Sequence, residues 1–262
     1  MTSPLNTLDN MKLEEYLEHL QEYLRDYLTN ARSSGYVLGL SGGVDSSLVA
    51  VLSAKAVGID KVTCIMMPIH SLEEDLQDAL KLAKHFHLKY EIVDASEVFD
   101  KYVSAFADIG VELDIATKSN LKARIRMSIL YAYAQKNNFL VLGTDNKDER
   151  YTGYFTKHGD GAADLFVISK LLKSEVVKAS KILGIPDELA ERVPSAGLFP
   201  GQTDEREMGI KYKDIDRYLL GDETVPEDVI AKIERLHRIT EHKRVPTPEP
   251  KEFIRDEDET IS

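Results

Sequence analysis

Four short apolar runs alternate with segments of helical periodicity, and this alternation limits the possible folds of the 262-residue chain more than any other feature. The runs have the length of buried strands and show no polar alternation, which is typical of a parallel sheet covered on both faces. They are Tyr36–Leu40, Val62–Met67, Tyr90–Val93 and Phe139–Leu142. The helical segments are Ser46–Val57, Leu72–Phe86, Val98–Ala107 and Leu121–Gln135. Strand alternating with helix predicts an α/β fold built on a doubly wound parallel sheet with flanking helices.

The rest of the chain predicts additions to this sheet rather than a second domain. Five leucines from Leu13 to Leu28, spaced by three and four, indicate an amphipathic helix at about 11–31. Helical patterns return at Lys173–Leu183 and Glu227–Glu241, while residues 143–164 are rich in glycine and charge, as functional loops often are. With no repeat and no linker, we expect a single domain over 1–262, with that N-terminal helix and a C-terminal extension at about 222–262.

Charge and composition exclude several classes of protein. A net charge of −12 argues against general binding of DNA or RNA, because neutralising phosphates supplies most of that affinity. The sequence contains no run of about 18 uncharged apolar residues, so it predicts no membrane span. The acidic start does not resemble a signal peptide. Cys64 alone can form no internal disulfide. We therefore expect a cytoplasmic protein that holds any anionic substrate with a local group of cations.

The strongest local signal is the segment YVLGLSGGVDSSLVAV, Tyr36–Val51. An apolar strand runs into two glycines and a helix opens at once, which brings unpaired N–H groups and the positive helix end to one place. The lysine of a Walker loop is absent. Asp45 would repel bare phosphates, so its natural partner is Mg²⁺ bridging to phosphate oxygens. The alternative is a plain strand-to-helix turn in which Ser or Asp caps the helix.

The SGGVDS segment resembles the signature of the N-type ATP pyrophosphatases, which have a Rossmann-like fold of the adenine nucleotide alpha hydrolase type. Two further segments, VLGTDNKDERYTGYFTKHGDGAAD at Val141–Asp164 and NLKARIRM at Asn120–Met127, resemble the NAD synthetases within that group, as does TEHKR at Thr240–Arg244. The resemblance implies ATP-dependent amidation of deamido-NAD, through an acyl-adenylate, to give NAD, AMP and pyrophosphate. The chain lacks a glutaminase domain, so the implied nitrogen donor is ammonia. The resemblance also implies a homodimer, for which the N-terminal helix and the helix at Leu121–Gln135 are candidates.

Carried over position by position, the resemblance implies three sets of site residues. Those for ATP are Gly39, Leu40, Ser41, Gly42, Gly43, Val44, Asp45, Ser46, Thr144, Lys173 and Ser195. Those for deamido-NAD are Arg124, Lys157, Asp164, His242 and Lys243. Mg²⁺ would lie between Asp45 and Glu149, and Asp45 and Lys173 would act in catalysis. The chain departs from the family pattern at Asn146, Arg150 and Ala162, where histidine, a small residue and glycine are frequent.

Several of these residues also have simpler interpretations. Glu149 follows a strand end, where ligands bind in open α/β sheets, but an isolated carboxylate there could be a solvated surface group. His242 and Lys243 could merely complement a helix dipole. Asp160 or Asp164 could bind ammonium and take its proton, and we favour Asp160, although loop solvation is the alternative. Rival functions are another ATP pyrophosphatase activity and a nucleotide-binding module without turnover.

Overall fold

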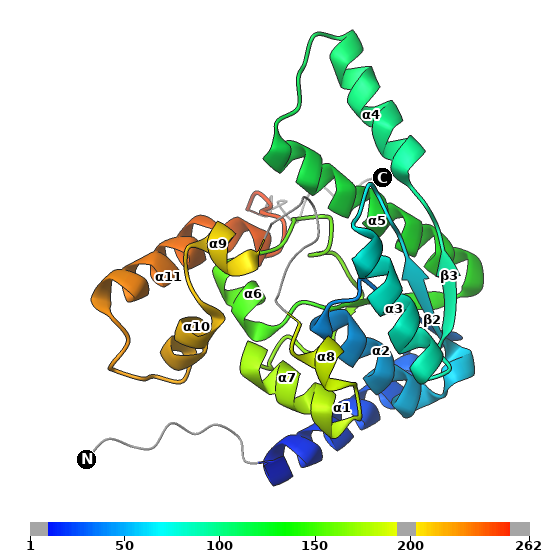
Figure 1. Cartoon of the computed structure of the whole chain (residues 1–262), viewed down its shortest axis with the longest axis vertical. Helices are drawn as coiled ribbons and strands as arrows, with labels where there is room; N and C mark the ends of the chain where they lie inside the picture. Colours follow the sequence, from blue (N-terminus) through cyan, green and yellow to red (C-terminus); the bar gives the residue numbers. More distant parts are fainter. Residues whose placement is uncertain (1–9, 193–202, 252–262) are drawn as a thin grey trace, which may run out of the picture.

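The computed structural model describes residues 10–192 and 203–251. Its centre is a sheet of five parallel strands in the order β3-β2-β1-β4-β5 (Figure 1). The strands are β1 Gly35–Gly39, β2 Val62–Met66, β3 Lys89–Ile92, β4 Phe139–Gly143 and β5 Leu165–Phe166. The first four confirm the predicted strands to within about a residue at each end. The two-residue β5 was not predicted, because it is too short to give a pattern of its own.

The chain reverses its direction of winding at β1. Tyr36 pairs with Val62 of β2 on one side and with Leu140 of β4 on the other. The connections after β1 and after β4 therefore leave the same edge of the sheet and diverge. In open α/β sheets the crevice outside this reversal is where ligands bind.

Helices cover both faces of the sheet, so the predicted doubly wound α/β fold is confirmed. The helices are α1 Asn10–Asn30, α2 Val44–Val57, α3 Glu73–His85, α4 Ser96–Asp108, α5 Ile115–Asn137, α6 Lys147–Thr152, α7 Lys173–Ile182, α8 Asp187–Ala190, α9 Asp204–Met208, α10 Tyr212–Leu219 and α11 Glu227–Ile239. Two 3₁₀ turns, Ile59–Lys61 and Glu241–Lys243, follow α2 and α11. No described helix is long and apolar enough to cross a membrane.

The main core lies between one face of the sheet and α1, α2, α3 and α7. All five predicted leucines of α1 are buried in it, and α1 packs on both α2 and α7. Helix α2 is apolar nearly all round, because it lies under α1 and α7 and over the sheet. The apolar face of α1 is thus used within the chain and is not open to a second copy, while a role of the rest of the helix in a homodimer stays a prediction.

The other face of the sheet is covered mainly by α5. Ala134 and its neighbours on α5 pack against Val37, Ile65 and Val141, which alternate with the residues facing α2. Helix α4 packs beside α5 and projects from the body at the top of Figure 1. Strand β3 is an edge strand with largely exposed residues, so the expectation that every strand is covered on both faces fails there.

A small separate core lies beyond the edge formed by β5. It is built from Ile210, Tyr212, Ile215 and Ile233, which join α10 and α11. Helices α6, α8, α9 and α10 have eight residues or fewer, and the periodicity of the sequence did not predict them. They matter for the site, because α6, α9 and α10 carry side chains that surround it.

Candidate active site

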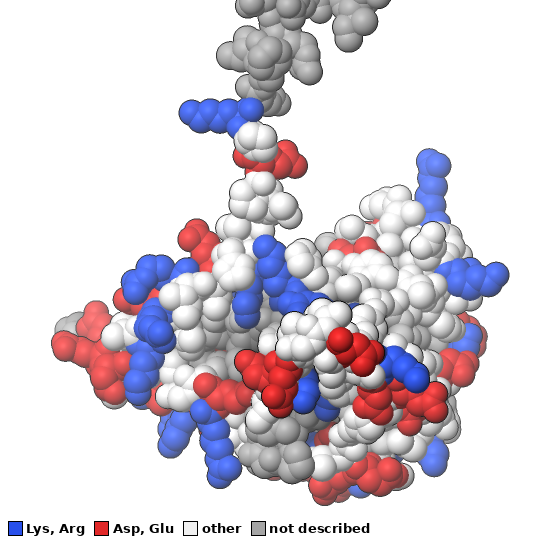
Figure 2. All heavy atoms as spheres, turned by 90° about the horizontal axis from the view of Figure 1, so that it is seen from above, with Lys and Arg blue, Asp and Glu red and all other residues white. Residues whose placement is uncertain are grey.

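A pocket of about 650 Å³ opens at the carboxyl edge of the sheet, beside the reversal at β1. Asp160 and Lys243 line this pocket, and so do most of the residues predicted for ATP and metal. Those are Gly39, Leu40, Ser41, Gly43, Val44, Asp45, Ser46, Thr144, Glu149 and Lys173. Figure 2, a view from above, shows a hollow near the centre of this face with lysine and arginine side chains along part of its rim. Within the described residues, the pocket lining holds four cationic residues, Arg126, Lys173, Arg192 and Lys243, among more numerous carboxyl groups.

The loop between β1 and α2 has the geometry of an anion-binding turn. Gly42 has a φ of +84°, and a Cβ there would lie 2.5 Å from the carbonyl oxygen of Asp75, so only glycine fits. Ser46 Oγ donates to the carbonyl of Gly43, and the Ser41 hydroxyl accepts from the N–H of Gly43. Gly43 itself precedes α2, and no side chain caps the helix. The alternative of a Ser or Asp cap is thus wrong, and the first N–H groups of α2 face the pocket for a ligand.

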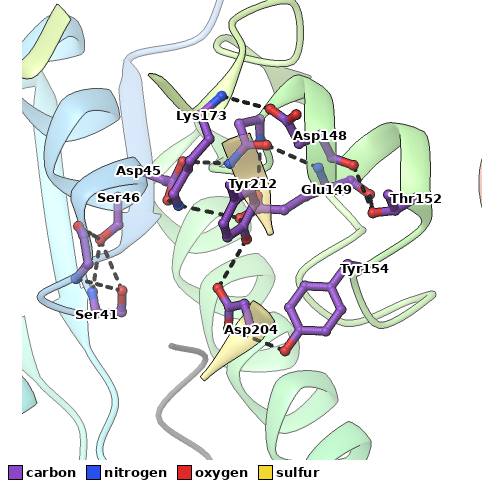
Figure 3. A network of polar contacts seen from close by, with 12 residues as sticks. Ser41, Asp45, Ser46, Asp148, Glu149, Thr152, Tyr154, Lys173, Asp204 and Tyr212 are labelled. Atoms are coloured by element: carbon purple, nitrogen blue, oxygen red, sulfur yellow. Dashed lines mark hydrogen bonds and ion pairs between the residues drawn. The ribbon is translucent and has the colours of Figure 1, made fainter. Parts of the chain in front are cut away.

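Three helix starts bring charged groups together beside this loop. Lys173 Nζ at the start of α7 lies 2.5 Å from Asp45 Oδ2 and 3.7 Å from Glu149 Oε1. Asn146 caps α6 through a reciprocal pair of hydrogen bonds with Glu149, and its Nδ2 donates to Asp45 Oδ1 at 2.9 Å. Figure 3 shows these side chains converging from α2, α6 and α7. Asp45, Glu149 and Lys173 are therefore neighbours, as the resemblance requires.

Burial and mutual charge set the protonation of this cluster. Burial, followed by the charge of Asp45, raises the pKa of Glu149 to about 8. Burial alone would lower the pKa of Lys173, but the charges of Asp45 and Glu149 outweigh it and raise the pKa above its ordinary value. Lys173 is thus a permanent cation that lies between the side chains of Asp45 and Glu149. One lysine does not neutralise two carboxylates, so a further cation would reduce the repulsion between them.

This pair of carboxylates fits Mg²⁺. The ion is usually held by one or two protein carboxylates together with phosphate oxygens and water, rather than by a cage of protein ligands. Among the described residues no group of three or more His, Cys, Asp or Glu side chains is placed to hold a metal. Asp45 and Glu149, which both approach Lys173 at the mouth of the phosphate loop, match the smaller donor set.

Two residues of this cluster were missed by sequence reasoning. Tyr212 Oη lies 3.2 Å from Glu149 Oε1 and 3.1 Å from Asp204 Oδ2, and its ring lies under Lys173 Nζ. Tyr154 Oη lies 3.2 Å from Asp204 Oδ1 (Figure 3). Asp204 and Tyr212 come from α9 and α10, whose short lengths gave no periodic signal.

Of the residues predicted for the dinucleotide, Lys243 lines the pocket, and Arg124, Lys157 and His242 lie close to it in the fold without lining the pocket themselves. Lys157 Nζ donates to the carbonyl of His242 at 2.7 Å, and the Arg124 guanidinium reaches the carbonyl of Lys157 at 3.3 Å. Lys243 Nζ donates to the carbonyls of Gly153 and Phe155, and burial lowers its pKa. Arg124, Lys157, His242 and Lys243 thus form one group, although the sequence separates them widely.

Asp164 lies apart from this group. Its carboxylate accepts from the backbone N–H of Val141 at 2.7 Å, so in this structure it ties the glycine-rich segment to β4. Its contact with the substrate stays a prediction. Ser195, predicted to contact ATP, lies outside the described residues.

Two further carboxyl groups of the lining are Asp145, which is buried, and Asp160, whose surface is exposed at the pocket. Asp160 Oδ1 accepts from the N–H of Thr156, and desolvation by the surrounding pocket walls raises the pKa of Asp160. Burial, with the charge of Asp160, also holds the pKa of Asp145 well above its ordinary value. Arg150 lies 3.5 Å from Asp145 and stacks on the rings of Phe155 and Phe166. Arg150 stands where the family pattern frequently has a small residue, and it places a cation beside Asp145 behind the pocket wall.

The reversed parallel sheet, the uncapped glycine loop and the cluster beside it define an α/β nucleotide-binding protein. The chain belongs to the NAD synthase family, whose sequence profile matches residues 16–247. It is 44% identical over 245 residues to the NH(3)-dependent NAD(+) synthetase of Mesoplasma florum, covering 94% of this chain and 100% of that protein.

Solved structures agree with this membership. The NMN synthetase from Francisella tularensis superposes with a TM-score of 0.86 at 37% identity, covering 91% of this chain and 98% of that one. The NH3-dependent NAD synthetase from Campylobacter jejuni, in complex with the nitrate ion, has a TM-score of 0.77 at 30% identity, covering 92% and 99%. The fold is therefore that of the family over almost its whole length.

Proposed function

We propose that this chain is an ammonia-dependent ligase that amidates deamido-NAD at the expense of ATP, giving NAD, AMP and pyrophosphate in the last step of NAD biosynthesis. Its relatives carry the name of NH(3)-dependent NAD(+) synthetase over nearly their full length. The observation that carries the proposal is the meeting of Asp45, Glu149 and Lys173 beside an open phosphate loop.

The first half of the reaction is an adenylation. The nicotinate carboxylate attacks the α-phosphate of ATP, an acyl-adenylate forms and pyrophosphate leaves. The N–H groups at the start of α2 and the hydroxyls of Ser41 and Ser46 suit the phosphate chain. Lys173, kept charged by its neighbours, would neutralise the charge that develops on the leaving pyrophosphate.

Asp45 and Glu149 would hold Mg²⁺ in this scheme. The ion supplies charge neutralisation and orientation of the phosphates when it is bound. Asn146 fixes Asp45 Oδ1 and closes the capping box with Glu149, so it orients both carboxylates. The family pattern frequently has histidine at position 146. In this chain Asn146 makes the contacts that orient Asp45 and Glu149.

The second half is the attack of ammonia on the acyl carbon, with AMP as the leaving group. Ammonium must first lose a proton to a base. The carboxylate of Asp160, which lines the pocket, suits that role, because desolvation raises its pKa towards the working range of a general base. Asp145 lines the same pocket, but its raised pKa favours the neutral carboxyl, so the base is assigned to Asp160.

We also propose that the working unit is a homodimer formed through α4 and the start of α5. This face exposes a row of large apolar side chains, which is unusual for a surface that stays in water. They are Val98, Tyr102, Phe106, Ile109, Val111 and Ile115. Ile115 also lines the pocket, so a second copy seated on this face would complete the wall of the site.

Nicotinate mononucleotide is a second candidate substrate, because the Francisella tularensis protein that shares this fold is an NMN synthetase. It carries the same reacting carboxylate and lacks the adenylate half of deamido-NAD. The group formed by Arg124, Lys157 and Lys243, with His242 beside them, favours the dinucleotide, since three cations suit a larger polyanion.

The test is one incubation of the purified chain with ATP, Mg²⁺ and ammonium, and with deamido-NAD or nicotinate mononucleotide. NAD, AMP and pyrophosphate in equal amounts from deamido-NAD support the proposal. A higher kcat/KM with the mononucleotide makes the second candidate correct. Pyrophosphate release only with some other acceptor indicates another ATP pyrophosphatase activity, and intact ATP throughout indicates a binding module.

A further inference from the structure

Arg126 of α5 carries a positive charge that the described part of the chain leaves unpaired. Its Nε donates to the carbonyl of Met67 at 3.0 Å and its Nη2 to the hydroxyl of Ser71 at 3.2 Å. Both acceptors are neutral, and within residues 10–192 and 203–251 no carboxylate forms an ion pair with this guanidinium. Lys173 and Arg192 line the same pocket and differ in this respect, since they pair with Asp45 and with Asp75 and Asp78.

An unpaired guanidinium in this position costs free energy. Burial lowers the pKa of Arg126 below its ordinary value, and the charges of Asp160 and Asp75 only partly offset the effect. Arg126 is half-buried by its accessible surface, and cations that are withdrawn from water in proteins are normally paired or hydrogen-bonded to anions. The two bonds to Met67 and Ser71 use part of the five N–H donors of an arginine, so donors remain for a ligand.

The position of Arg126 shows where that ligand would lie. The side chain lines the pocket, and its partner Met67 directly follows β2 at the carboxyl edge of the sheet. Strand β2 lies on one side of β1, whereas Glu149 follows β4 on the other. Arg126 therefore approaches the pocket from the β2 side of β1, opposite to Glu149.

We propose that Arg126 binds an anionic oxygen of a bound substrate, a phosphate or carboxylate oxygen, and that this anion supplies the charge partner that the protein omits. The inference rests on the proposed function, which brings an ATP phosphate and a nicotinate carboxylate into this pocket. Both sources share the chemistry that a guanidinium recognises, two oxygens presented to a planar fork.

Two substitutions separate binding from folding. Arg126→Gln keeps an amide that can donate to Met67 or Ser71 but removes the charge. Arg126→Lys keeps the charge and loses the planar fork. Lys136→Ala, at an exposed position of the same helix, is the matched control. Mg·ATP and deamido-NAD are titrated separately into each full-length variant by calorimetry, and the free energy of unfolding is measured without ligand.

We expect Arg126→Gln to weaken one of the two ligands by about 10- to 100-fold, as the loss of a charged hydrogen bond does, while Arg126→Lys restores part of the affinity. Weakened Mg·ATP identifies an ATP phosphate as the partner, and weakened deamido-NAD identifies an anion of that substrate. If the Gln variant fails to fold, the Lys variant decides, because a lost contact with an anion lowers affinity without lowering unliganded stability.

Wild-type affinity for both ligands in Arg126→Gln would overturn the inference. So would an affinity loss in Arg126→Lys that is matched by a loss of unliganded stability, because Arg126 would then be a structural residue. The proposed function is judged apart from this, by NAD formation in the wild-type protein. A wild type that forms NAD with unaffected Arg126 variants refutes this inference alone.

Discussion

Lys173 Nζ and Asp45 Oδ2 lie 2.5 Å apart, and this contact joins the first turn of α7 to the first turn of α2. The two helices pack side by side under α1, so the pair is held by the main core and not by a mobile loop. The phosphate loop and its cation thus move as one unit.

We expect Lys173→Ala to lower kcat for pyrophosphate release by about 100- to 1000-fold, the usual effect of removing one preorganised charge from a transition state. Lys181→Ala, in the last turn of the same helix and paired only with surface acids, should retain activity. The measurement is steady-state pyrophosphate release with deamido-NAD. Equal rates in the two variants would contradict the role of Lys173.

We expect chelation of Mg²⁺ to abolish the reaction and Glu149→Gln to raise the half-saturating Mg²⁺ concentration by roughly tenfold or more. Glu149 and Asp45 repel one another, as the raised pKa of Glu149 indicates, and a divalent ion relieves that repulsion. The check is a Mg²⁺ titration of activity. Glu188→Gln, on the surface beside Lys81, serves as the control. An unchanged Mg²⁺ requirement would show that Glu149 is no ligand.

Asp148 and Asp216 form a buried acidic pair behind Lys173. Asp148 Oδ2 accepts from the N–H of Lys173 at 2.7 Å, and Asp216 Oδ2 accepts from the N–H of Ser174 at 3.2 Å. The Oδ1 atom of each has no hydrogen-bond partner within the described residues. Burial and the charge of Asp216 raise the pKa of Asp148 to about 9.

This pair predicts a pH dependence of stability with a definite sign. The folded chain keeps the proton on Asp148 up to about pH 9, whereas the unfolded chain releases it near pH 4. Unfolding therefore releases a proton between these values, and stability falls as pH rises. Asp148→Asn removes this term, so its free energy of unfolding should fall less steeply from pH 5.5 to 8.5, by up to about 1.4 kcal/mol per pH unit. If the two proteins lose stability with pH at the same rate in urea denaturation, Asp148 does not carry the proton in the folded chain.

Leu24→Ala should lower the free energy of unfolding by about 2–5 kcal/mol, because Leu24 is fully buried between α1 and the main core. Tyr23→Ala, next to it on the exposed side of the same helix, should change it by only about 0.5 kcal/mol. Denaturant unfolding of both variants measures the difference. Similar losses would mean that the apolar face of α1 is not what attaches this helix.

Light scattering should give the wild type twice the 29.5 kDa mass of one chain. Tyr102→Asp, at a half-exposed position of α4, should shift the mass to that of one chain, because a charge in an apolar interface loses its water. Glu14→Lys on the exposed side of α1 should leave the mass unchanged. A wild type of single mass would contradict the proposed dimer.

Sequence reasoning predicted the elements that have their own local pattern. The strands from β1 to β4 are apolar runs bounded by polar residues, and the glycine loop before α2 needs a backbone that only glycine allows at Gly42. Asp45 directly follows the glycine loop and Glu149 lies in the segment after β4, so their approach could be predicted from the strand order. Lys173 follows the unpredicted β5, so its place came from the family resemblance alone.

The remaining parts of the site depend on contacts between distant short elements. Tyr212 and Asp204 reach Glu149 from helices that are too short to show periodicity, and Arg126 is distinguished only by the carboxylate that it lacks. The apolar face of α4 has the same pattern as a buried face, and sequence alone does not say what covers it. Such features arise when distant elements pack together, and the secondary-structure propensities of the residues do not predict those contacts.

The packing of α1 also has a consequence for the order in which the chain is made. Helix α1 leaves the ribosome before α2 and α7 and can dock on α2 early, but the part of its leucine face that meets α7 has no partner until residues 173–182 have been synthesised. Until then apolar surface remains open to water, which is the condition under which nascent chains aggregate or bind chaperones. The N-terminal helix therefore finishes folding late although it is translated first.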